Sequence, residues 1–102
     1  MLKELTGRRK KNYDITVFQT PQFRQDRGYT QVYRLAIKAE GHQDCFEKVF
    51  KLFNVPDTIP ADYKGRFMST GDIILIDEGL RGHHYYQLKA GGWTKINRIQ
   101  VR

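Results

Sequence analysis

The stretch DCFEKVFKLFN, residues 44–54, decides the fold because it combines a helical pattern with a start and a stop signal. Its apolar residues repeat at the i, i+3, i+4, i+7 spacing that places them on one helix face: Phe46, Val49, Phe50 and Phe53. Asp44 and Glu47 have the spacing of a capping box, and Asn54 followed by Pro56 predicts the helix end. Burying each phenylalanine contributes about 1.5–3 kcal/mol, so we expect this helix to hold the core together.

Two segments before the helix have the pattern of β-strands. YDITVFQT, residues 13–20, alternates so that Tyr13, Ile15 and Val17 share one face. TQVYRLAIKA, residues 30–39, alternates in the same way, although a helical reading groups Val32, Tyr33 and Ala36. Its β-branched and aromatic residues favour the strand.

Strands also follow the helix. DIILID, residues 72–77, is a continuous apolar run that predicts a buried strand. Residues 78–84 form a glycine-containing turn, and residues 85–89 with the segment from Trp93 predict a hairpin around two glycines. The order β-β-α-β-β-β predicts an α+β fold, in which one amphipathic helix packs on a small, mostly antiparallel β-sheet.

The length of 102 residues corresponds to one domain. We place that domain at residues 13–102 and treat residues 1–12 as a basic N-terminal extension that is a candidate for flexibility. No segment approaches the roughly 18 apolar residues of a membrane span. A single cysteine, Cys45, cannot form an internal disulfide and suits a reducing compartment. We therefore expect a cytoplasmic protein without a membrane span.

The positive charge is uneven along the chain, whose net charge is +7. Residues 1–40 hold nine Lys and Arg against four Asp and Glu, and residues 41–102 hold nine against seven. The densest cluster is GRRKK, residues 7–11. This distribution favours a polyanionic partner, either nucleic acid or an acidic protein face, and a solvated basic terminus explains it equally well.

The stretch GRFMSTGD, residues 65–72, has the look of a phosphate-binding loop but lacks its essential parts. A Walker loop ends in Gly-Lys-Ser/Thr and leads into a helix. Here Gly71 and Asp72 lead into a strand instead. We expect Gly71 to form a tight turn and Asp72 to hydrogen-bond the local backbone, so the stretch serves the strand entry and not catalysis.

Metal-binding and nucleophilic patterns are weak. His42 and Cys45 form an H-x-x-C pair without the second pair that a zinc site needs. His83 and His84 are adjacent and would point to opposite faces of a strand. Cys45 lies within the apolar helix and fits a buried small side chain better than a thiolate. We expect no catalytic residue, no metal and no cofactor, and therefore no enzymatic activity.

Several segments, taken in order, resemble the YodL-like domain family: YDITVFQT, YTQVYRL, CFEKVFKLFN, DYKGRFMSTGDIILI and YYQLKAGGWTKI. The resemblance spans residues 13–97, is most specific at residues 65–72 and leaves residues 1–12 outside. It implies a small domain typical of conjugative elements and phages of Gram-positive bacteria. It also implies a partner such as the bacterial actin-like cytoskeleton, and it brings no catalytic residues with it.

Two functions follow as hypotheses. The first is a non-enzymatic binding protein, encoded on a mobile genetic element or phage, that inhibits or modulates a host protein or ribonucleoprotein machine. The cytoskeleton or a defence nuclease is the expected target, the latter as an anti-CRISPR protein. Arginines and large aromatics carry most interface energy, so the candidate contacts are Arg66, Arg81, Tyr85, Tyr86 and Trp93.

The alternative is a single-strand or RNA-binding accessory module of a conjugation or replication apparatus. Such modules stack bases on aromatic rings and hold phosphates with basic side chains. The candidate phosphate contacts are Arg8, Arg9, Lys10, Lys11, Arg34 and Lys38. The sequence leaves the oligomeric state open.

Overall fold

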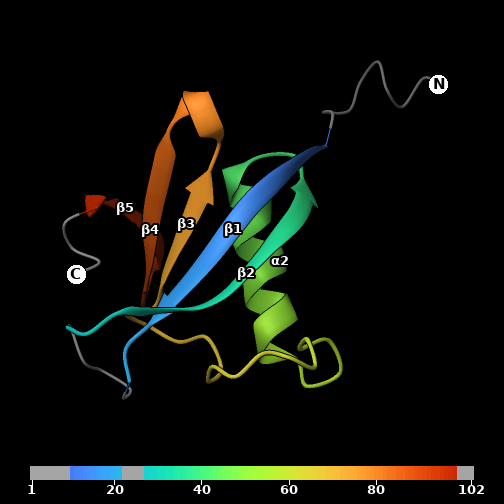
Figure 1. The fold of residues 1–102 in the computed structure, drawn as a ribbon, viewed down its shortest axis with the longest axis vertical. Coiled ribbons are helices and arrows are strands. Elements are labelled where there is room, and N and C mark those ends of the chain that lie inside the picture. The colour runs from blue at the N-terminus through green and yellow to red at the C-terminus, as the bar shows by residue number, and fades with distance from the viewer. Residues whose placement is uncertain (1–9, 22–26, 99–102) are drawn as a thin grey trace.

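The computed structural model describes residues 10–21 and 27–98 (Figure 1). These residues form one α-helix and a five-stranded sheet in the order β2-β1-β3-β4-β5. The strands are β1 (Lys11–Gln19), β2 (Thr30–Ala39), β3 (Ile73–Asp77), β4 (His83–Lys89) and β5 (Gly92–Ile96). The helix is α2 (His42–Asn54), and a 3-10 turn, η1 (Gly79–Arg81), joins β3 to β4. Among the described residues, no helix has the length and apolar character needed to cross a membrane.

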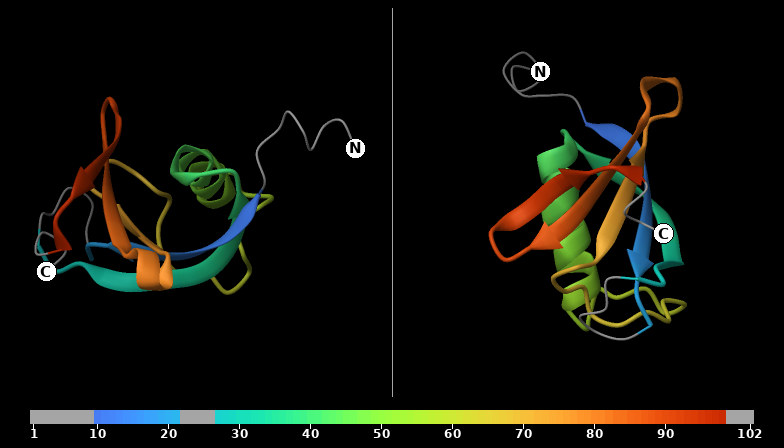
Figure 2. Two further views of the ribbon diagram at one scale, coloured as in Figure 1. Left: turned by 90° about the horizontal axis from the view of Figure 1, so that it is seen from above. Right: turned by 90° about the vertical axis from the view of Figure 1, so that its left-hand side faces the viewer.

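The helix lies on one face of the sheet, and the sheet curves partly around it (Figure 2). All neighbouring strands pair antiparallel. The fold is thus mostly β, with one helix packed on an antiparallel sheet as the sequence predicts. The strand reading of residues 30–39 is confirmed.

The period of two along each strand separates a helix-facing side of the sheet from an outer side. Tyr13, Ile15 and Val17 of β1 are buried towards the helix, and the register places Ile15 opposite Leu35 of β2 and Ile76 of β3. The core therefore forms where β1, β2 and β3 meet the helix.

The start of α2 differs from the prediction. The helix begins at His42 after Gly41, and no side chain caps it. Asp44 is the third helical residue, and its carboxylate reaches back to accept a 3.0 Å hydrogen bond from the Glu40 N–H. The predicted capping box with Glu47 is therefore wrong, because the helix starts earlier than its acidic residues indicate.

The other end of α2 is fixed by Asn54, the last helical residue. Its side-chain oxygen accepts a 2.7 Å hydrogen bond from the Met68 N–H, and its amide donates to the Met68 carbonyl at 3.0 Å. Val55 then continues in extended backbone. The predicted position of the helix end is confirmed, but Asn54 is still helical and Val55 is extended, so the left-handed exit that an Asn at this position predicts is not formed. Asn54 also ties the helix to the loop before β3.

The apolar stripe of α2 divides into two neighbouring rows, and the members of each row are one helical turn apart. The core row, which is completely buried, consists of Cys45, Val49 and Phe53. The groove row consists of His42, Phe46 and Phe50; it faces β4 and β5, where the Phe46 ring lies 4.6 Å from the Tyr86 ring. Phe50 at its end is 42% exposed. The sequence predicted a single stripe, whereas the structure gives its two rows different surroundings.

Residues 65–72 are tied to the end of β1 by the buried amide of Gln19. This amide donates to the Arg66 carbonyl at 2.9 Å and to the Asp72 carboxylate at 3.0 Å, and it accepts the Arg66 N–H at 3.1 Å. A Cβ at Gly65 would lie 2.6 Å from the Gln19 side-chain oxygen. A side chain at this position would push the ends of the Tyr63 and Gln19 side chains away from their hydrogen bonds to Arg66, so glycine is favoured there.

Asp72 is buried at the start of β3 and receives both a backbone and a charged partner. Its carboxylate accepts a 2.9 Å hydrogen bond from the Ser69 N–H and lies 2.9 Å from the Arg66 guanidinium. Burial raises the pKa of Asp72, against the lowering effect of these two partners. Gly71 beside it has φ +98°, so the predicted tight turn and local hydrogen bond are both confirmed.

Candidate binding groove and histidine cluster

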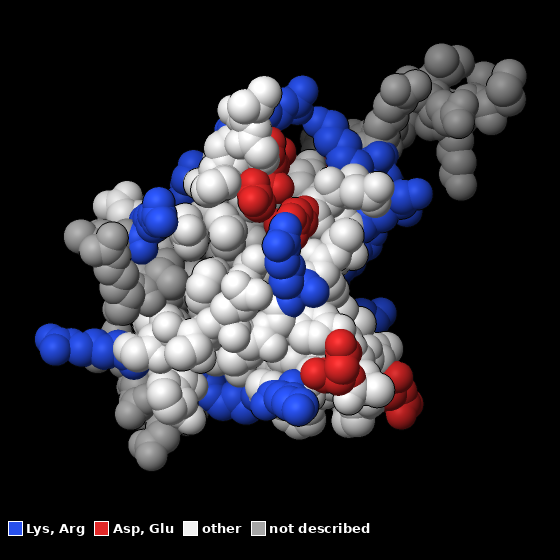
Figure 3. Space-filling view, in the orientation of Figure 1, with Lys and Arg blue, Asp and Glu red and all other residues white. Residues whose placement is uncertain are grey.

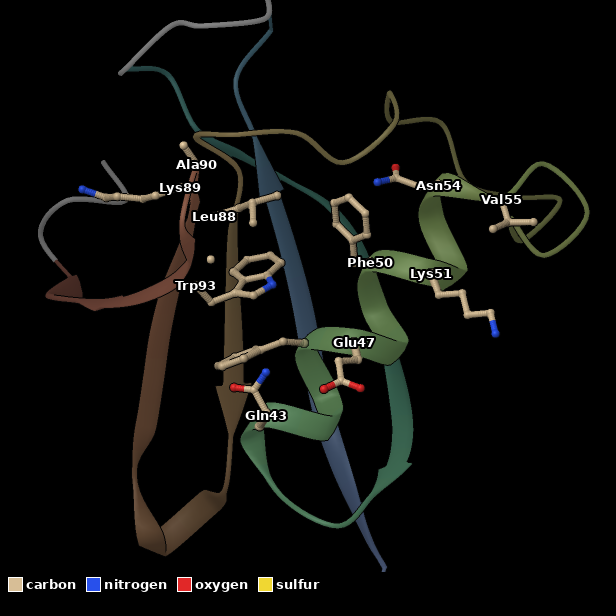
Figure 4. A pocket seen from close by; sticks show the side chains of 12 residues that line it. Gln43, Glu47, Phe50, Lys51, Asn54, Val55, Leu88, Lys89, Ala90 and Trp93 are labelled. Carbon is tan, nitrogen blue, oxygen red and sulfur yellow. The ribbon is translucent and has the colours of Figure 1, made fainter.

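An apolar groove of about 670 Å³ lies between α2 and the β4–β5 hairpin (Figure 4). Phe50 on the helix and Trp93 on β5 stand on opposite walls, with Leu88 of β4 between them. Lys51, Lys89 and Glu47 lie on its polar rim. The volume falls within the range of about 300–1,000 Å³ that is usual for ligand sites.

The strand register explains why the groove is apolar. Leu88 of β4 pairs with Trp93 of β5 on the helix-facing side, and Tyr86 precedes Leu88 by two residues on that side. Phe46 and Phe50 are one helical turn apart and face these strands. Five apolar or aromatic side chains thus converge from two sequence regions.

Aromatic contacts hold one end of the groove in place. The Phe46 ring stacks on the Trp93 ring at a centroid distance of 5.4 Å, and it meets the Tyr86 ring edge-on at 4.6 Å. Phe50 and Val55 at the other end are 42% and 37% exposed. One end is therefore packed and preformed, and the other presents apolar surface to a ligand.

The outer side of the sheet has a different character. Phe18 of β1 and Tyr85 of β4 lie there with their ring centroids 6.4 Å apart. The helix lies on the opposite side (Figure 2), but the outer side is not fully open: Ile73 is completely buried there, and Phe18 and Tyr85 are half-buried. Figure 3 views this side: most Lys and Arg side chains stand along its edges, one lies near the centre next to acidic side chains, and the rest of the centre is uncharged.

Three residues with metal-ligating side chains meet beside the groove. His42 Nε2 lies 2.8 Å from the Glu78 carboxylate, and His84 Nε2 lies 3.2 Å from the same oxygen. His42 Nδ1 lies 2.7 Å from the Tyr86 hydroxyl. We call His42, Glu78 and His84 the histidine cluster.

The chain matches the YodL-like domain family over residues 3–98. The uncharacterized protein YodL of Bacillus subtilis (strain 168) is 50% identical to it over 102 residues, which is all of this chain and 98% of that protein. The chain belongs to the YodL-like domain family. The resemblance inferred from the sequence is confirmed, and the matched region also includes most of the basic segment at residues 1–12. No solved structure matches the chain.

The predicted partner contacts are distributed over several parts of this YodL-like domain. Tyr86 and Trp93 meet at Phe46 on the helix-facing side, and Trp93 lines the groove. Tyr85 lies on the outer side, and Arg81 lies exposed in η1. The guanidinium of Arg66 lies in the internal ion pair with Asp72. The five residues do not form one surface, and their roles in binding stay predictions.

The predicted nucleic-acid contacts divide in a similar way. Arg8 and Arg9 lie outside the described residues. Lys10, Lys11 and Lys38 are exposed near one end of the β1–β2 pair. Arg34, on the outer side, forms an ion pair with Asp14 at 2.5 Å, and it lowers the pKa of that carboxyl. Because Arg34 is paired with Asp14, the three lysines are the described members of this predicted set that are more available to bind phosphates.

Sequence reasoning missed the histidine cluster because its members are far apart in the chain. Glu78 and His84 flank the turn between β3 and β4, and His42 comes from the helix start. The sequence signal that could have found the cluster is the period of two along β4, which places His83 and His84 on opposite faces of the sheet. His83 indeed points away from the cluster and lies 3.2 Å from Asp77. Cys45, which forms an H-x-x-C pattern with His42 in the sequence, is not one of the three residues in the cluster.

Cys45 itself is completely buried in the core row. Burial raises the pKa of its thiol to about 11. The thiol is therefore protonated at neutral pH and weakly nucleophilic. The predicted role as a small buried side chain is confirmed.

Proposed function

We propose that this YodL-like domain is a non-enzymatic binding protein whose groove takes an apolar segment of a host protein. The observation that carries the proposal is the half-exposed Phe50 facing Trp93 across a preformed apolar groove. Large aromatic side chains at such positions supply much of the energy of protein interfaces. The buried, protonated Cys45 thiol supports a binding role over nucleophilic catalysis.

The shape and charge of the groove favour a particular kind of segment. Phe50 and Val55 continue the apolar surface along the helix, which suits an extended or helical peptide better than a compact small molecule. Lys51 and Lys89 on the rim outnumber Glu47, and the net charge of the chain is +7. The expected partner is thus an apolar segment flanked by acidic residues, whose approach is accelerated by charge.

The proposed consequence of binding is inhibition or modulation of a host machine by a protein encoded on a mobile genetic element or phage. The bacterial actin-like cytoskeleton is the first target to test, and a defence nuclease is the second, in an anti-CRISPR role. A net positive charge does not suit mimicry of DNA, so an acidic protein surface or a guide RNA is the expected contact.

The test compares Phe50→Ala with Phe67→Ala, because Phe67 is a second exposed phenylalanine, 56% exposed, outside the groove. Binding of each variant to the purified actin-like protein is measured by calorimetry. A pull-down from nuclease-treated bacterial lysate identifies other candidate partners, which are then purified and measured in the same way. We expect Phe50→Ala to weaken binding by at least about tenfold and Phe67→Ala to leave it unchanged. Equal affinities for the wild type and both variants would reject the groove as the binding site.

A second function is favoured by the outer side of the sheet, where Phe18 and Tyr85 lie together, half-buried, on the side opposite the helix. Such a ring pair can stack unpaired bases, while Lys10, Lys11 and Lys38 hold phosphates. The test is the salt dependence of binding to single-stranded RNA, with a slope of about −0.7 per phosphate contact. A flat dependence, or a Tyr85→Ala variant that binds as well as the wild type, would reject this function.

A further inference from the structure

We propose that the histidine cluster binds a divalent transition metal of the zinc class. Its two imidazole nitrogens and one carboxylate oxygen all lie within 4.8 Å of one another. This inference does not rest on the proposed function, because none of the three ligands lines the groove, although His42 belongs to the same helix row as Phe46 and Phe50. It departs from the expectation of no metal that the sequence gives.

The separations of the ligand atoms suit a small ion. Zinc bonds to histidine nitrogen and carboxylate oxygen are about 2.0–2.2 Å long, which places tetrahedral ligand atoms about 3.3–3.6 Å apart. His42 Nε2 and His84 Nε2 lie 2.8 and 3.2 Å from the Glu78 oxygen. The two histidine nitrogens lie within 4.8 Å of each other. Side-chain rotations that open the two contacts to Glu78 and bring all three ligand atoms to tetrahedral spacing would admit the ion.

The backbone delivers the three ligands from separate, well-defined elements. His42 is the first residue of α2, Glu78 directly follows β3, and His84 lies on β4. The Glu78 N–H donates a 2.9 Å hydrogen bond to the Gly82 carbonyl, which fixes the turn between Glu78 and His84. Glu78 and His84 thus project to the helix-facing side of the sheet, where the helix start supplies His42.

The burial of the cluster indicates a site with an open coordination position. The side chains of Glu78, His84 and His42 are 17%, 22% and 26% exposed. Three protein ligands with partial access to solvent leave room for a water molecule or a partner group as the fourth ligand. Structural zinc sites, by contrast, are closed by four protein ligands.

Tyr86 supplies the outer contact that histidine ligands usually have. Its hydroxyl lies 2.7 Å from His42 Nδ1, so this nitrogen can keep its proton and leave the Nε2 lone pair for the metal. The Tyr13 and Tyr86 rings both meet the His42 ring edge-on, at 5.7 and 5.6 Å. The ring is therefore held in one orientation before any metal binds.

The donor set selects the class of metal. Imidazole nitrogen suits zinc, copper, iron and nickel, whereas magnesium and calcium prefer sites built from oxygen. Without a metal, His42 and His84 can each donate an Nε2 proton to Glu78, so a hydrogen-bonded cluster is the competing explanation. The two differ in whether the cluster binds an added ion saturably.

The experiment uses the full chain without a histidine tag, stripped with a chelator and titrated with Zn²⁺ by calorimetry. Co²⁺ replaces Zn²⁺ in a parallel absorption titration, and Mg²⁺ is the negative control. We expect one Zn²⁺ per chain in the wild type. His84→Gln and Glu78→Gln should weaken binding by at least about 100-fold, and Tyr86→Phe by about tenfold.

His83→Gln is the matched control, because His83 is the sequence neighbour of His84 and points away from the cluster. It should bind Zn²⁺ as the wild type does. The proposal is overturned if the wild type shows no saturable Zn²⁺ binding, if both cluster variants keep wild-type affinity, or if His83→Gln loses as much as His84→Gln. Circular dichroism checks each fold, and Glu78→Gln, which preserves side-chain size, decides the matter if His84→Gln does not fold.

Discussion

The two rows of α2 belong to the same helix and carry similar apolar side chains, yet their surroundings differ. The core row meets β1, β2 and β3 and is completely buried, with Phe53 between Tyr33 and Tyr63 at ring distances of 5.7 and 4.7 Å. The groove row faces β4 and β5, although His42 at its start also meets Tyr13 of β1, and its last member, Phe50, stays half-exposed. Helical periodicity shows which residues share a face, and the arrangement of the strands decides how far that face is covered.

The strongest test of this difference is Phe53→Ala. Removing this ring from a closed part of the core should lower the free energy of unfolding by about 3–5 kcal/mol, because a cavity is left among Val49, Tyr33 and Tyr63. Urea denaturation measures the change. A loss below about 1 kcal/mol would mean that the core row is not the more tightly packed of the two.

Outside the helix, the stability of the fold also depends on the buried Asp72–Arg66 pair. Asp72→Asn should cost about 3 kcal/mol in urea denaturation, because one buried acceptor oxygen is replaced by an amide N–H₂ that faces the Arg66 guanidinium. Asp62→Asn is the control, since Asp62 is exposed and accepts one hydrogen bond, from the Tyr33 hydroxyl. Similar losses for the two variants would show that the burial of Asp72 is not what makes its pair important.

Cys45, in the core row, makes the stability of the protein sensitive to alkaline pH. Its folded-state pKa of about 11 exceeds the usual value of 9.0, so the folded protein keeps a proton that the unfolded chain releases. This stabilising contribution is complete below about pH 8 and is lost as the pH rises towards about 11. Between about pH 8 and pH 10, the wild type should lose about 1 kcal/mol more stability than Cys45→Ala.

Urea denaturation of both proteins at the two pH values measures that difference. The cost of the substitution itself cancels, because each protein is compared with itself. Parallel losses in the wild type and Cys45→Ala would show that the Cys45 thiol ionises equally easily in the folded and unfolded states.

The smallest expected effect on stability is that of Phe50→Ala, on the groove side. Since Phe50 is 42% exposed, its removal should change the free energy of unfolding by about 1 kcal/mol or less. Thermal denaturation beside Phe53→Ala gives the comparison directly. If Phe50→Ala destabilises the protein as much as Phe53→Ala does, the groove row is part of the core and its exposure is no sign of a binding site.

The elements that sequence reasoning predicted correctly depend on local patterns. The period of two in residues 13–20 and the helical spacing of Phe46, Val49 and Phe53 survive in the structure. The turn at Gly71 and Asp72 was also predicted, because Asp72 bonds backbone three residues away. Such features are set within one element or one turn.

The features that were missed depend on contacts between distant residues. Whether Phe50 is covered depends on where the β4–β5 hairpin ends, and this is not encoded in the helix. Arg66 has the residue type of an interface contact, but its partner Gln19 is 47 positions away. His42 and Glu78 are 36 positions apart and meet only in the fold, where the helix start lies beside the end of β3 and the start of β4.

The sheet order also determines which strands could pair with a second copy of the protein. With the order β2-β1-β3-β4-β5, the described sheet ends in β2 and β5, whose outer backbone groups are available for β-sheet extension. β2 is ten residues long but carries Arg34 and Lys38, whose like charges would be brought together in many side-by-side pairings of two copies. β5 is only five residues long and begins at Gly92. Charge on one edge and shortness on the other thus both disfavour edge-to-edge pairing of this open sheet.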